Sequence, residues 1–418
     1  MSDRILARYR IETPHPVERA AEMLAGEQSS GTFVQVPGET EALRARHRAR
    51  VEEIVRLPDA EAPGLPGSRP PKGHAGPVSY HRAELLVSFP LENVGVNLPT
   101  LLSTVAGNLF ELSEFSGLKL LDLEVPAAYT ERYPGPQFGI EGTRRLCGVY
   151  DRPILGTIVK PSVGLTPAQT AELVRELAEA GIDFIKDDEL MADPPHSPLA
   201  ERVAAVTRVI HDHADRTGKR VMYAFNISDE LDAMLRHHDT VLRAGGTCVM
   251  VSLNSIGLSA LSHLRRHCAL PIHGHRNGWG IYARSPHLGI EFTAFQKLWR
   301  LAGADHLHVN GIANKFWEPD DSVVRSVQSV LTPLFGGYPA MPVLSSGQWG
   351  GQAPETYRLT GTTDVMYLAG GGIMAHPDGP GAGLIAIRQA WAAAVEGVPL
   401  EEYTRERPEL RRQLEKFA

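Results

Sequence analysis

The chain has 418 residues, 43% of them hydrophobic and 22% charged, which is enough for more than one buried core. Its formal net charge of −7 gives no electrostatic reason to expect a nucleic acid partner. The three cysteines are odd in number and form no CxxC pair, so a disulfide framework is not expected. The N-terminal segment lacks the apolar core of a signal peptide, and no uncharged apolar run has membrane-spanning length. We therefore expect a cytoplasmic protein without a membrane partner.

Residues 1–140 are predicted to form a small N-terminal α+β domain of ferredoxin-like type. The residue pattern predicts two strands and two helices there, with strands at 85–89 and 119–123 and helices near 16–24 and 100–107. A segment rich in proline and glycine, 57–78, interrupts this pattern and predicts an exposed loop.

Residues 141–418 alternate short apolar runs with amphipathic helical patterns. The first helix has the clearest signals, because Thr166 caps it, Pro167 stands in its first turn and Gly181 ends it. Strand–helix units repeated eight times are the signature of a (β/α)8 TIM barrel. The expected strands are 154–159, 183–186, 221–225, 248–253, 272–275, 306–309, 343–345 and 365–368.

Chemistry in such barrels gathers at the carboxyl ends of the strands, and polar or special residues recur at these positions here. In strand order they are Lys160, then Lys186, Asp188 and Glu189, then His275 and Arg276, then His308, then Ser346 and Gly347, and finally Gly370, Gly371 and Gly372. Scattered surface residues would not repeat in this way. The pattern therefore predicts one site at the mouth of the barrel.

The second strand runs into a lysine and three consecutive acids, Lys186-Asp187-Asp188-Glu189. Adjacent carboxylates repel one another unless a cation lies near them, and hard oxygen ligands favour Mg²⁺. An ammonium group cannot bind a metal, so Lys186 could join only as a neutral amine or as a carbamate formed with CO2. A solvated acidic turn is the alternative, and the other strand ends make it the weaker one.

Glycine turns after the last two strands are where barrels often bind phosphate through backbone N–H groups. Either turn alone would usually be only a turn, but the two together favour a phosphate site. Arg276 could hold a second anionic group or, alternatively, form a structural salt bridge.

Two further strand-end residues receive a predicted role. His308 and His306 have the spacing of a zinc site, but no third soft ligand is near, so we expect His308 to contact substrate. Lys160 precedes Pro161 beside the expected metal and is the predicted acid–base group.

These residues resemble the large chain of ribulose-bisphosphate carboxylase (RuBisCO) and its non-carboxylating form IV relatives, the RuBisCO-like proteins. The most specific stretches are 156–161, Gly-Thr-Ile-Val-Lys-Pro, and 183–189, Asp-Phe-Ile-Lys-Asp-Asp-Glu; 134–140, His275-Arg276, Gly370–Gly372 and His376-Pro377 support them. The resemblance covers nearly the whole chain. It implies that Lys186, as a carbamate, binds one Mg²⁺ in each active site with Asp188 and Glu189, and that Lys160 is the acid–base group.

The resemblance also implies a homodimer or a multiple of dimers. Segment 27–33 looks like the family's segment that reaches into the neighbouring subunit's barrel, and Asn108 matches its asparagine. Glu27, Thr32 and Asn108 are therefore expected to contact substrate in the partner's active site, with Glu27 beside Lys315.

Several departures from the carboxylases put CO2 fixation in doubt. Ser162 stands where their second lysine stands, and Ile158 and Phe33 replace a threonine and a tryptophan. Gly347-Gln348 replaces a double glycine, and the mobile loop reads Asn-Lys-Phe-Trp-Glu-Pro at 314–319. Bulky side chains and a proline are expected to change how that loop closes. The residues for metal binding, enolisation and phosphate binding are retained.

We predict a Mg²⁺-dependent enzyme that forms an enediolate from a phosphorylated keto sugar or sugar acid, with catalytic roles for Lys160, Lys186, His275 and Lys315. In the carboxylases the lysine that corresponds to Lys315 grips CO2. Its retention favours decarboxylation or C–C cleavage of a phosphorylated β-keto sugar acid. The alternative is an isomerase or tautomerase of a phosphorylated ketose such as methylthioribulose phosphate. A true carboxylase ranks third, and a non-enzymatic redox-response or assembly protein is the rival from another class.

Overall fold

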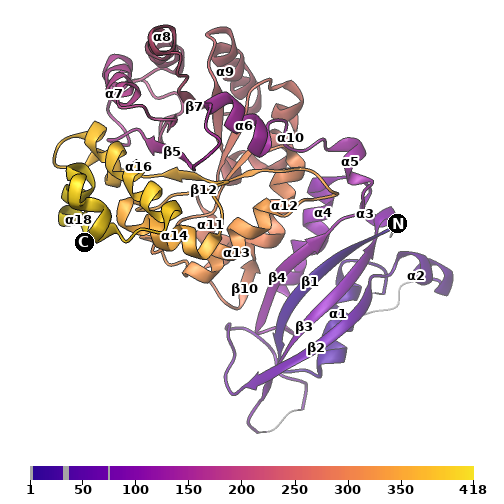
Figure 1. The fold of residues 1–418 in the computed structure, drawn as a ribbon. Helices are drawn as coiled ribbons and strands as arrows, with labels where there is room; N and C mark the ends of the chain where they lie inside the picture. The colour runs from indigo at the N-terminus through magenta and orange to yellow at the C-terminus, as the bar shows by residue number, and fades with distance from the viewer. Residues whose placement is uncertain (1–2, 32–36, 74–75) are drawn as a thin grey trace. The chain divides into compact units, whose positions relative to one another are not determined.

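The computed structural model describes residues 3–31, 37–73 and 76–418, which form two compact units (Figure 1). The first unit comprises residues 1–134 and 278–301, and the second comprises 135–277 and 302–418. Within the described residues, no helix is long and apolar enough to cross a membrane.

The first unit is built on a five-stranded sheet in the order β10-β4-β1-β3-β2. The strands are β1 (Arg4–Thr13), β2 (Arg50–Ala60), β3 (Tyr80–Pro90), β4 (Gly117–Glu124) and β10 (Leu288–Ile290). The helices are α1 (Val17–Glu27), α2 (Glu41–His47), α3 (Leu91–Val94), α4 (Leu98–Ala106), α5 (Tyr129–Arg132), α11 (Trp279–Ala283) and α12 (Phe292–Ala302), with the 3-10 helix η1 (Asn108–Glu111). Alternate residues of β1 are buried, and the Tyr9 hydroxyl donates to the Val105 carbonyl, so α4 covers this face.

The predicted α+β domain is confirmed, although the sequence prediction missed β1 and β2. The buried alternation in β1, from Ile5 to Ile11, was a readable strand signal. β2 continues to Ala60, into the segment expected to be a loop, with Pro58 where the pairing with β3 shifts its register. β2 is the edge strand, and an edge or an irregular position tolerates a proline because its missing N–H breaks no ladder bond.

Segment 278–301 belongs to the first unit, whereas the expected boundary at residue 140 leaves it with the barrel. Strand β10 pairs in parallel with β4, from Leu288 opposite Leu118 to Ile290 opposite Leu120. Buried Lys119 lies 3.0 Å from the Glu291 carboxylate and donates to two carbonyls of the same segment. A three-residue strand so far along the chain carries no local signal of its partner.

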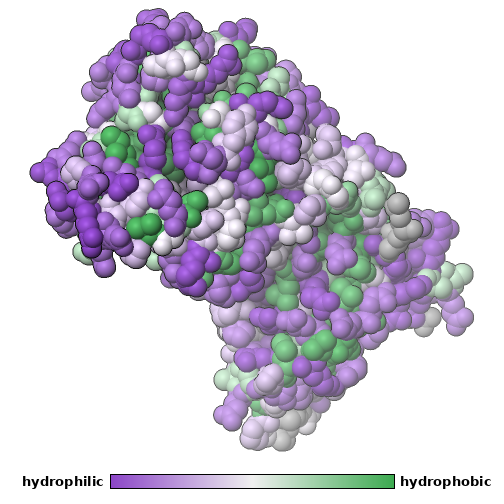
Figure 2. Space-filling view, in the orientation of Figure 1, coloured by the Kyte–Doolittle hydropathy of each residue, from purple (hydrophilic) through white to green (hydrophobic). Residues whose placement is uncertain are grey.

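The second unit is a closed barrel of eight parallel strands, as predicted. Its strands are β5 (Ile154–Ile158), β6 (Phe184–Lys186), β7 (Met222–Asn226), β8 (Cys248–Ser252), β9 (Ile272–His275), β11 (His306–His308), β12 (Met341–Leu344) and β13 (Met366–Leu368). Its helices are α6 (Gly139–Cys147), α7 (Pro167–Glu179), α8 (Leu199–Thr217), α9 (Leu231–Arg243), α10 (Leu253–His267), α13 (Asp320–Leu331), α14 (Ala353–Thr360), α15 (Gly371–Met374), α16 (Pro380–Glu396), α17 (Leu400–Tyr403) and α18 (Pro408–Phe417). The outer helices bury one face each, and the side visible in Figure 2 is largely hydrophilic.

Side chains at alternate strand positions fill the barrel. An apolar cluster occupies its depth, formed by Ile154, Phe184, Met222, Ala224, Cys248, Met250, Met341, Val343, Met366 and Leu368. The same alternation, continued toward the carboxyl ends, directs Lys186, Asn226, Ser252 and Ser345 toward the interior at the mouth. The barrel is therefore apolar at its centre and polar at its mouth.

Asp183, just before β6, is a fully buried carboxylate at the amino end of the barrel. It forms ion pairs with Arg152 at 2.6 Å and with Lys219 at 2.8 Å, and it accepts a hydrogen bond from the Leu155 amide. Burial alone would raise the pKa of Asp183, but the bonds and charges of Arg152 and Lys219 outweigh it and hold that pKa below its ordinary value.

Replacing Asp183 by Asn should lower the free energy of unfolding at pH 7 by roughly 1.5–3 kcal/mol, because two partly exposed cations lose a charged partner. Since the folded pKa lies below the unfolded one, this contribution is present above about pH 4 and is lost as the pH falls through the folded pKa. Urea unfolding at pH 7 and near pH 3 measures both effects. Asp378→Asn, which breaks an exposed pair with Arg412, is the control and should cost under about 1 kcal/mol. An Asp183→Asn deficit that does not shrink in acid would contradict the assignment.

Candidate active site

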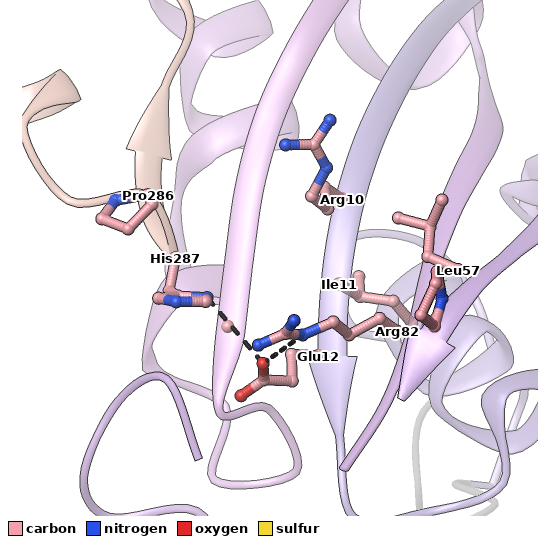
Figure 3. A pocket seen from close by; sticks show the side chains of 9 residues that line it. Arg10, Ile11, Glu12, Leu57, Arg82, Pro286 and His287 are labelled. Atoms are coloured by element: carbon pink, nitrogen blue, oxygen red, sulfur yellow. Dashed lines mark hydrogen bonds and ion pairs between the residues drawn. The ribbon is translucent and has the colours of Figure 1, made fainter. Parts of the chain in front are cut away.

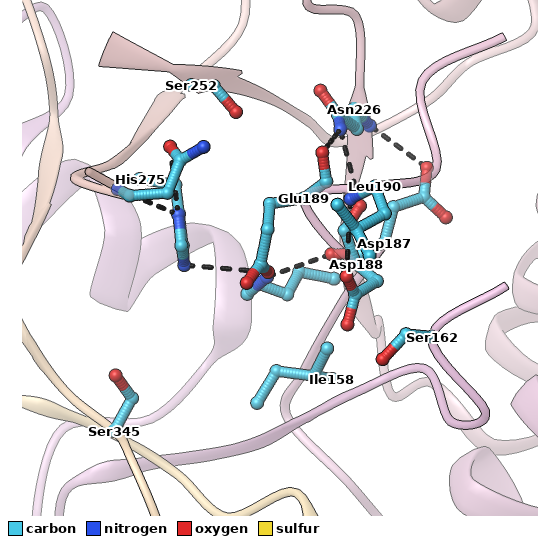
Figure 4. A network of polar contacts seen from close by, with 12 residues as sticks. Ile158, Ser162, Asp187, Asp188, Glu189, Leu190, Asn226, Ser252, His275 and Ser345 are labelled. Carbon is cyan, nitrogen blue, oxygen red and sulfur yellow. Dashed lines mark hydrogen bonds and ion pairs between the residues drawn. The ribbon is translucent and has the colours of Figure 1, made fainter. Parts of the chain in front are cut away.

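The carboxyl end of β6 brings Lys186 and Glu189 together inside the barrel mouth. Figure 4 shows Glu189 pointing toward His275. Lys186 is 1% exposed, and its amine donates to the Asp187 carbonyl at 2.9 Å and lies 3.5 Å from a Glu189 carboxylate oxygen. His275, at the end of β9, places Nε2 3.6 Å from the same Glu189 oxygen. The three predicted residues therefore form one cluster.

Asp187, the first acid of the triplet, has a structural role instead. Its carboxylate is paired with buried Arg202 at 3.2 Å and accepts hydrogen bonds from the Tyr223 hydroxyl and the Asn226 amide. Arg202 thus supplies the cation that Asp187 requires. The Asn226 side chain donates to the carbonyls of Asp188 and Glu189, which fixes the turn that presents these two carboxylates to the mouth.

Lys160 lies beside this cluster at the end of β5. Its amine is 2.7 Å from an Asp188 carboxylate oxygen and 2.7 Å from the Ser162 hydroxyl, so Ser162 contacts Lys160. The turn after β13 is close by, because a Cβ atom built on Gly370 would lie 3.8 Å from the Lys160 side chain. A Cβ on Gly371 would meet nothing within 4 Å, so this glycine turn has open space in front of it.

The cluster is electrostatically coupled. Burial lowers the pKa of Lys186, although the neighbouring carboxylates oppose this, so neutral amine is easier to form there. Burial alone would raise the pKa of Glu189, but the charges of His275 and Lys186 hold it at about 2. Burial and the Lys186 charge lower the pKa of His275 to about 4.

This donor set fits Mg²⁺ if Lys186 carries a carbamate. Glu189 and Asp188 offer hard carboxylate oxygens, and the neutral amine is the form that reacts with CO2 to give two more. Lys186, Asp188 and Glu189 are therefore the residues that would hold the ion.

The other predicted residues of the barrel lie around this cluster. His308 is buried at the end of β11, with its ring centroid 4.4 Å from that of His275. Lys315 is exposed, and its backbone N–H donates to the Ser346 carbonyl at 3.0 Å, which ties its loop to the turn of Ser346 and Gly347 after β12. A Cβ atom on Gly347, which has a φ of 89°, would lie 3.3 Å from the Lys315 Cβ atom.

Arg276 forms a buried ion pair with Glu318 at 2.6 Å. The Asn310 side chain also donates to Glu318. The salt bridge considered for Arg276 from the sequence is thus present, and any contact of Arg276 with an anionic substrate group has to coexist with it.

Three predicted residues are not placed in this cluster. Glu27 is half-buried at the last residue of α1, and Asn108 is exposed at the first residue of η1, both in the first unit. Thr32 lies outside the described residues. Asn226, which the sequence prediction left without a role, sits in the mouth, and the rule that selected the other strand ends would have found it.

One further group of possible metal ligands among the described residues is His238, Asp239 and His267. The Ala269 amide donates to Nε2 of His238, so the ring proton of neutral His238 is on Nδ1, where it is donated to Asp239 at 2.9 Å. A protonated Nδ1 cannot ligate a metal. This geometry therefore favours a hydrogen-bonded cluster.

The first unit contains a cavity of about 330 Å³ (Figure 3). Its two arginines are already paired, Arg82 with buried Glu12 at 2.7 Å and Arg10 with Glu84 at 2.8 Å. The charges of this pocket are thus balanced within the unit.

Comparison with known proteins gives matches over both units. The models for the ribulose bisphosphate carboxylase large chain match residues 1–129 with the N-terminal domain and 139–417 with the catalytic domain. The chain is 51% identical over 413 residues to 3-oxo-isoapionate-4-phosphate decarboxylase of Rhizobium etli, with 98% of each chain covered. It is 54% identical over 413 residues to 3-oxo-isoapionate-4-phosphate transcarboxylase/hydrolase of Xanthobacter autotrophicus, again with 98% of each covered. The structure of a rubisco-like protein from Burkholderia fungorum superposes with a TM-score of 0.92 at 49% identity and covers all of both chains.

Replacing Arg276 by Ala should destabilise the protein by roughly 3–5 kcal/mol, because it leaves the buried Glu318 carboxylate without its cation. Pairing it with Glu318→Ala should restore much of this loss, since the uncompensated charge is then removed. Urea unfolding of both variants measures the difference. Equal stability of Arg276→Ala and wild type would show that the ion pair is not formed in solution.

Proposed function

Because this chain belongs to the family of the ribulose bisphosphate carboxylase large chain, we propose that its barrel mouth binds Mg²⁺ and removes the carboxylate of a phosphorylated β-keto sugar acid. The observation that supports this proposal is sequence identity of 51% and 54%, along nearly the whole chain, to two enzymes named for 3-oxo-isoapionate 4-phosphate. That name describes a 3-oxo acid with a phosphate on carbon 4, which is a β-keto acid. The substrate class inferred from the retention of Lys315 is the same.

Loss of CO2 from such an acid breaks the bond between the carboxylate carbon and the neighbouring α-carbon. The bonding electron pair moves toward the keto group and gives an enolate, which is an enediolate when the α-carbon carries a hydroxyl group and which then needs a proton on that carbon. Mg²⁺ held by Lys186 as a carbamate, Asp188 and Glu189 would, when bound, stabilise negative charge on the substrate oxygens.

Lys160 is the residue best placed to deliver the proton. Its ammonium group is held 2.7 Å from Asp188, which keeps the cation next to the proposed metal ligands and beside the turn at Gly370. Ser162 accepts from the same amine and so orients it. Lys160 as a general acid converts the enediolate into the ketone product.

Substrate binding follows from the turns around the cluster. The glycine turn with open space at Gly371 and the turn at Ser346 and Gly347 are proposed to accept the phosphate through backbone N–H groups. Lys315, tied to the second turn through its backbone, is proposed to hold the substrate carboxylate. The two relatives share the named substrate but differ in the named reaction, so release of CO2 and transfer of the carboxyl group both fit this arrangement.

The functional unit is proposed to be a cytoplasmic homodimer or a multiple of dimers. Glu27 and Asn108 lie in the first unit. Their proposed role in another subunit's barrel rests on the resemblance to the carboxylases. Thr32 belongs to the same proposal.

Replacing Lys186 by Ala should abolish turnover and Mg²⁺-dependent ligand binding while the barrel stays folded, because the change removes a proposed metal ligand. Decarboxylation assays and titration calorimetry with Mg²⁺, after incubation with bicarbonate, measure the two losses. Lys297→Ala, which removes a partly exposed pair with Asp122, is the control and should remain active. Full turnover by Lys186→Ala without added CO2 or small carboxylates would refute the carbamate.

Replacing Lys315 by Met separates the proposed reaction from an isomerase. If Lys315 holds the substrate carboxylate, CO2 release should collapse and substrate binding should weaken, while substrate proton exchange with deuterated water persists at saturating substrate. If the enzyme isomerises a neutral keto sugar, the loss should stay under about tenfold in kcat/KM, or about 1.4 kcal/mol. Lys416→Met, a C-terminal lysine, is the control. A panel of phosphorylated keto sugars and keto sugar acids in which wild type isomerises but releases no CO2 and transfers no carboxyl group would favour the isomerase.

A further inference from the structure

Five buried side chains form a continuous line of polar contacts through the barrel, from α6 to the mouth. Thr143 Oγ lies 2.8 Å from His306 Nε2, and His306 Nδ1 lies 3.2 Å from His273 Nδ1. His273 Nε2 lies 2.8 Å from His308 Nε2, and His308 Nδ1 lies 3.0 Å from Ser345 Oγ. All five side chains are buried, so solvent does not compete for these contacts.

The direction of the line is set at Thr143. Its hydroxyl donates its single proton to the Gly139 carbonyl one helical turn earlier. Thr143 can then only accept from His306, so His306 carries its ring proton on Nε2 and offers Nδ1 as an acceptor.

The remaining protons follow one by one, because a neutral imidazole has one donor and one acceptor. His273 must donate from Nδ1 to His306, His308 must donate from Nε2 to His273, and Ser345 must donate its hydroxyl proton to Nδ1 of His308. Burial lowers the pKa of all three histidines, that of His306 to about 3, so the neutral rings assumed here are the stable ones.

The hydroxyl oxygen of Ser345 therefore presents lone pairs to the mouth, and its proton points to His308. Ser345 follows β12 at the barrel mouth, and its neighbour Ser346 donates its own proton to the Asn310 side chain at 2.9 Å. A partner for Ser345 on the mouth side must be a donor. Phosphate and carboxylate oxygens are excluded as partners, and a hydroxyl group fits.

We propose that Ser345 is a specificity-determining residue that accepts a hydrogen bond from a substrate hydroxyl, and that Thr143, at the other end of the histidine line, fixes it in this role. The proposal rests on the proposed function and adds a requirement for a hydroxyl donor near the turn after β12. It makes Thr143 a positioning residue that acts without touching the substrate.

Neutron diffraction from deuterium-exchanged crystals of the full chain reads the line directly, with no substrate needed. Deuterons should lie on Nε2 of His306, Nδ1 of His273, Nε2 of His308 and, on Ser345, toward His308. A deuteron on the other nitrogen of any of these rings, or a ring deuterated on both nitrogens, would overturn the proposal.

Kinetics with 3-oxo-isoapionate 4-phosphate test the consequence. Ser345→Ala should raise KM about fivefold to tenfold with little change in kcat, as expected for the loss of one neutral hydrogen bond. Thr143→Val removes the terminal acceptor and lets the line reverse, so that Ser345 presents its proton; KM should rise similarly although Ser345 is intact. Thr143→Ser keeps the hydroxyl and should restore the wild-type KM. Ser326→Ala, a buried serine of α13, is the control for packing.

Unchanged KM in Ser345→Ala would refute the specificity role, even if the deuterons lie as expected. A Thr143→Ser variant as impaired as Thr143→Val would show that packing, and not proton direction, matters at this site. If wild type does not turn over this compound, the proposed substrate fails, and the deuteron positions alone then decide whether Ser345 is held as an acceptor. If Thr143→Val does not fold, the Ser345→Ala result and the deuteron positions still decide.

Discussion

The buried ion pair of Arg202 and Asp187 is the interaction on which the cluster at the barrel mouth depends. The Arg202 side chain is fully buried, and besides Asp187 it donates to the carbonyls of Met191, Ala192 and Ser197. One guanidinium thus neutralises the first acid and fixes the loop that follows it. Because that loop is fixed, Asp188 and Glu189 are held in the barrel mouth, where Lys160 and Lys186 lie beside them. Leaving the buried Asp187 carboxylate without this arginine would cost several kcal/mol of folding free energy.

The barrel separates two kinds of interior. Its depth is packed with methionine and aliphatic side chains, while the mouth holds the lysines, carboxylates and histidines of the cluster. The histidine line is the exception, because it carries polar groups through the apolar region with every ring nitrogen paired along the line. Paired polar groups are tolerated in such surroundings, whereas a single unpaired ring nitrogen would be costly.

Much of this arrangement could be predicted from residue order. All eight barrel strands were predicted because buried parallel strands are short apolar runs between helical patterns, and the polar residues at their ends identified Lys160, Lys186 and His275. Local patterns could not show which residues meet in space. The pairing of Arg276 with Glu318 joins separate loops, and the role of Asp187 depends on an arginine in the next helix. Neither contact follows from the sequence, since a run of acids has the same sequence whether it faces a metal or an arginine.

Segment 278–301 affects how the protein folds during synthesis, because it belongs to the first unit but follows much of the barrel in the sequence. Strand β10 completes the sheet of the first unit only after five of the eight barrel strands have been translated. Until then β4 is an open edge with unpaired backbone groups, and Lys119 lacks the Glu291 carboxylate. Folding from the N-terminus, the usual order during translation, therefore cannot finish the first unit by itself. A nascent chain of about 280 residues should hold a four-stranded intermediate in which β4 is an exposed edge. That edge is a surface to which a ribosome-associated chaperone could bind.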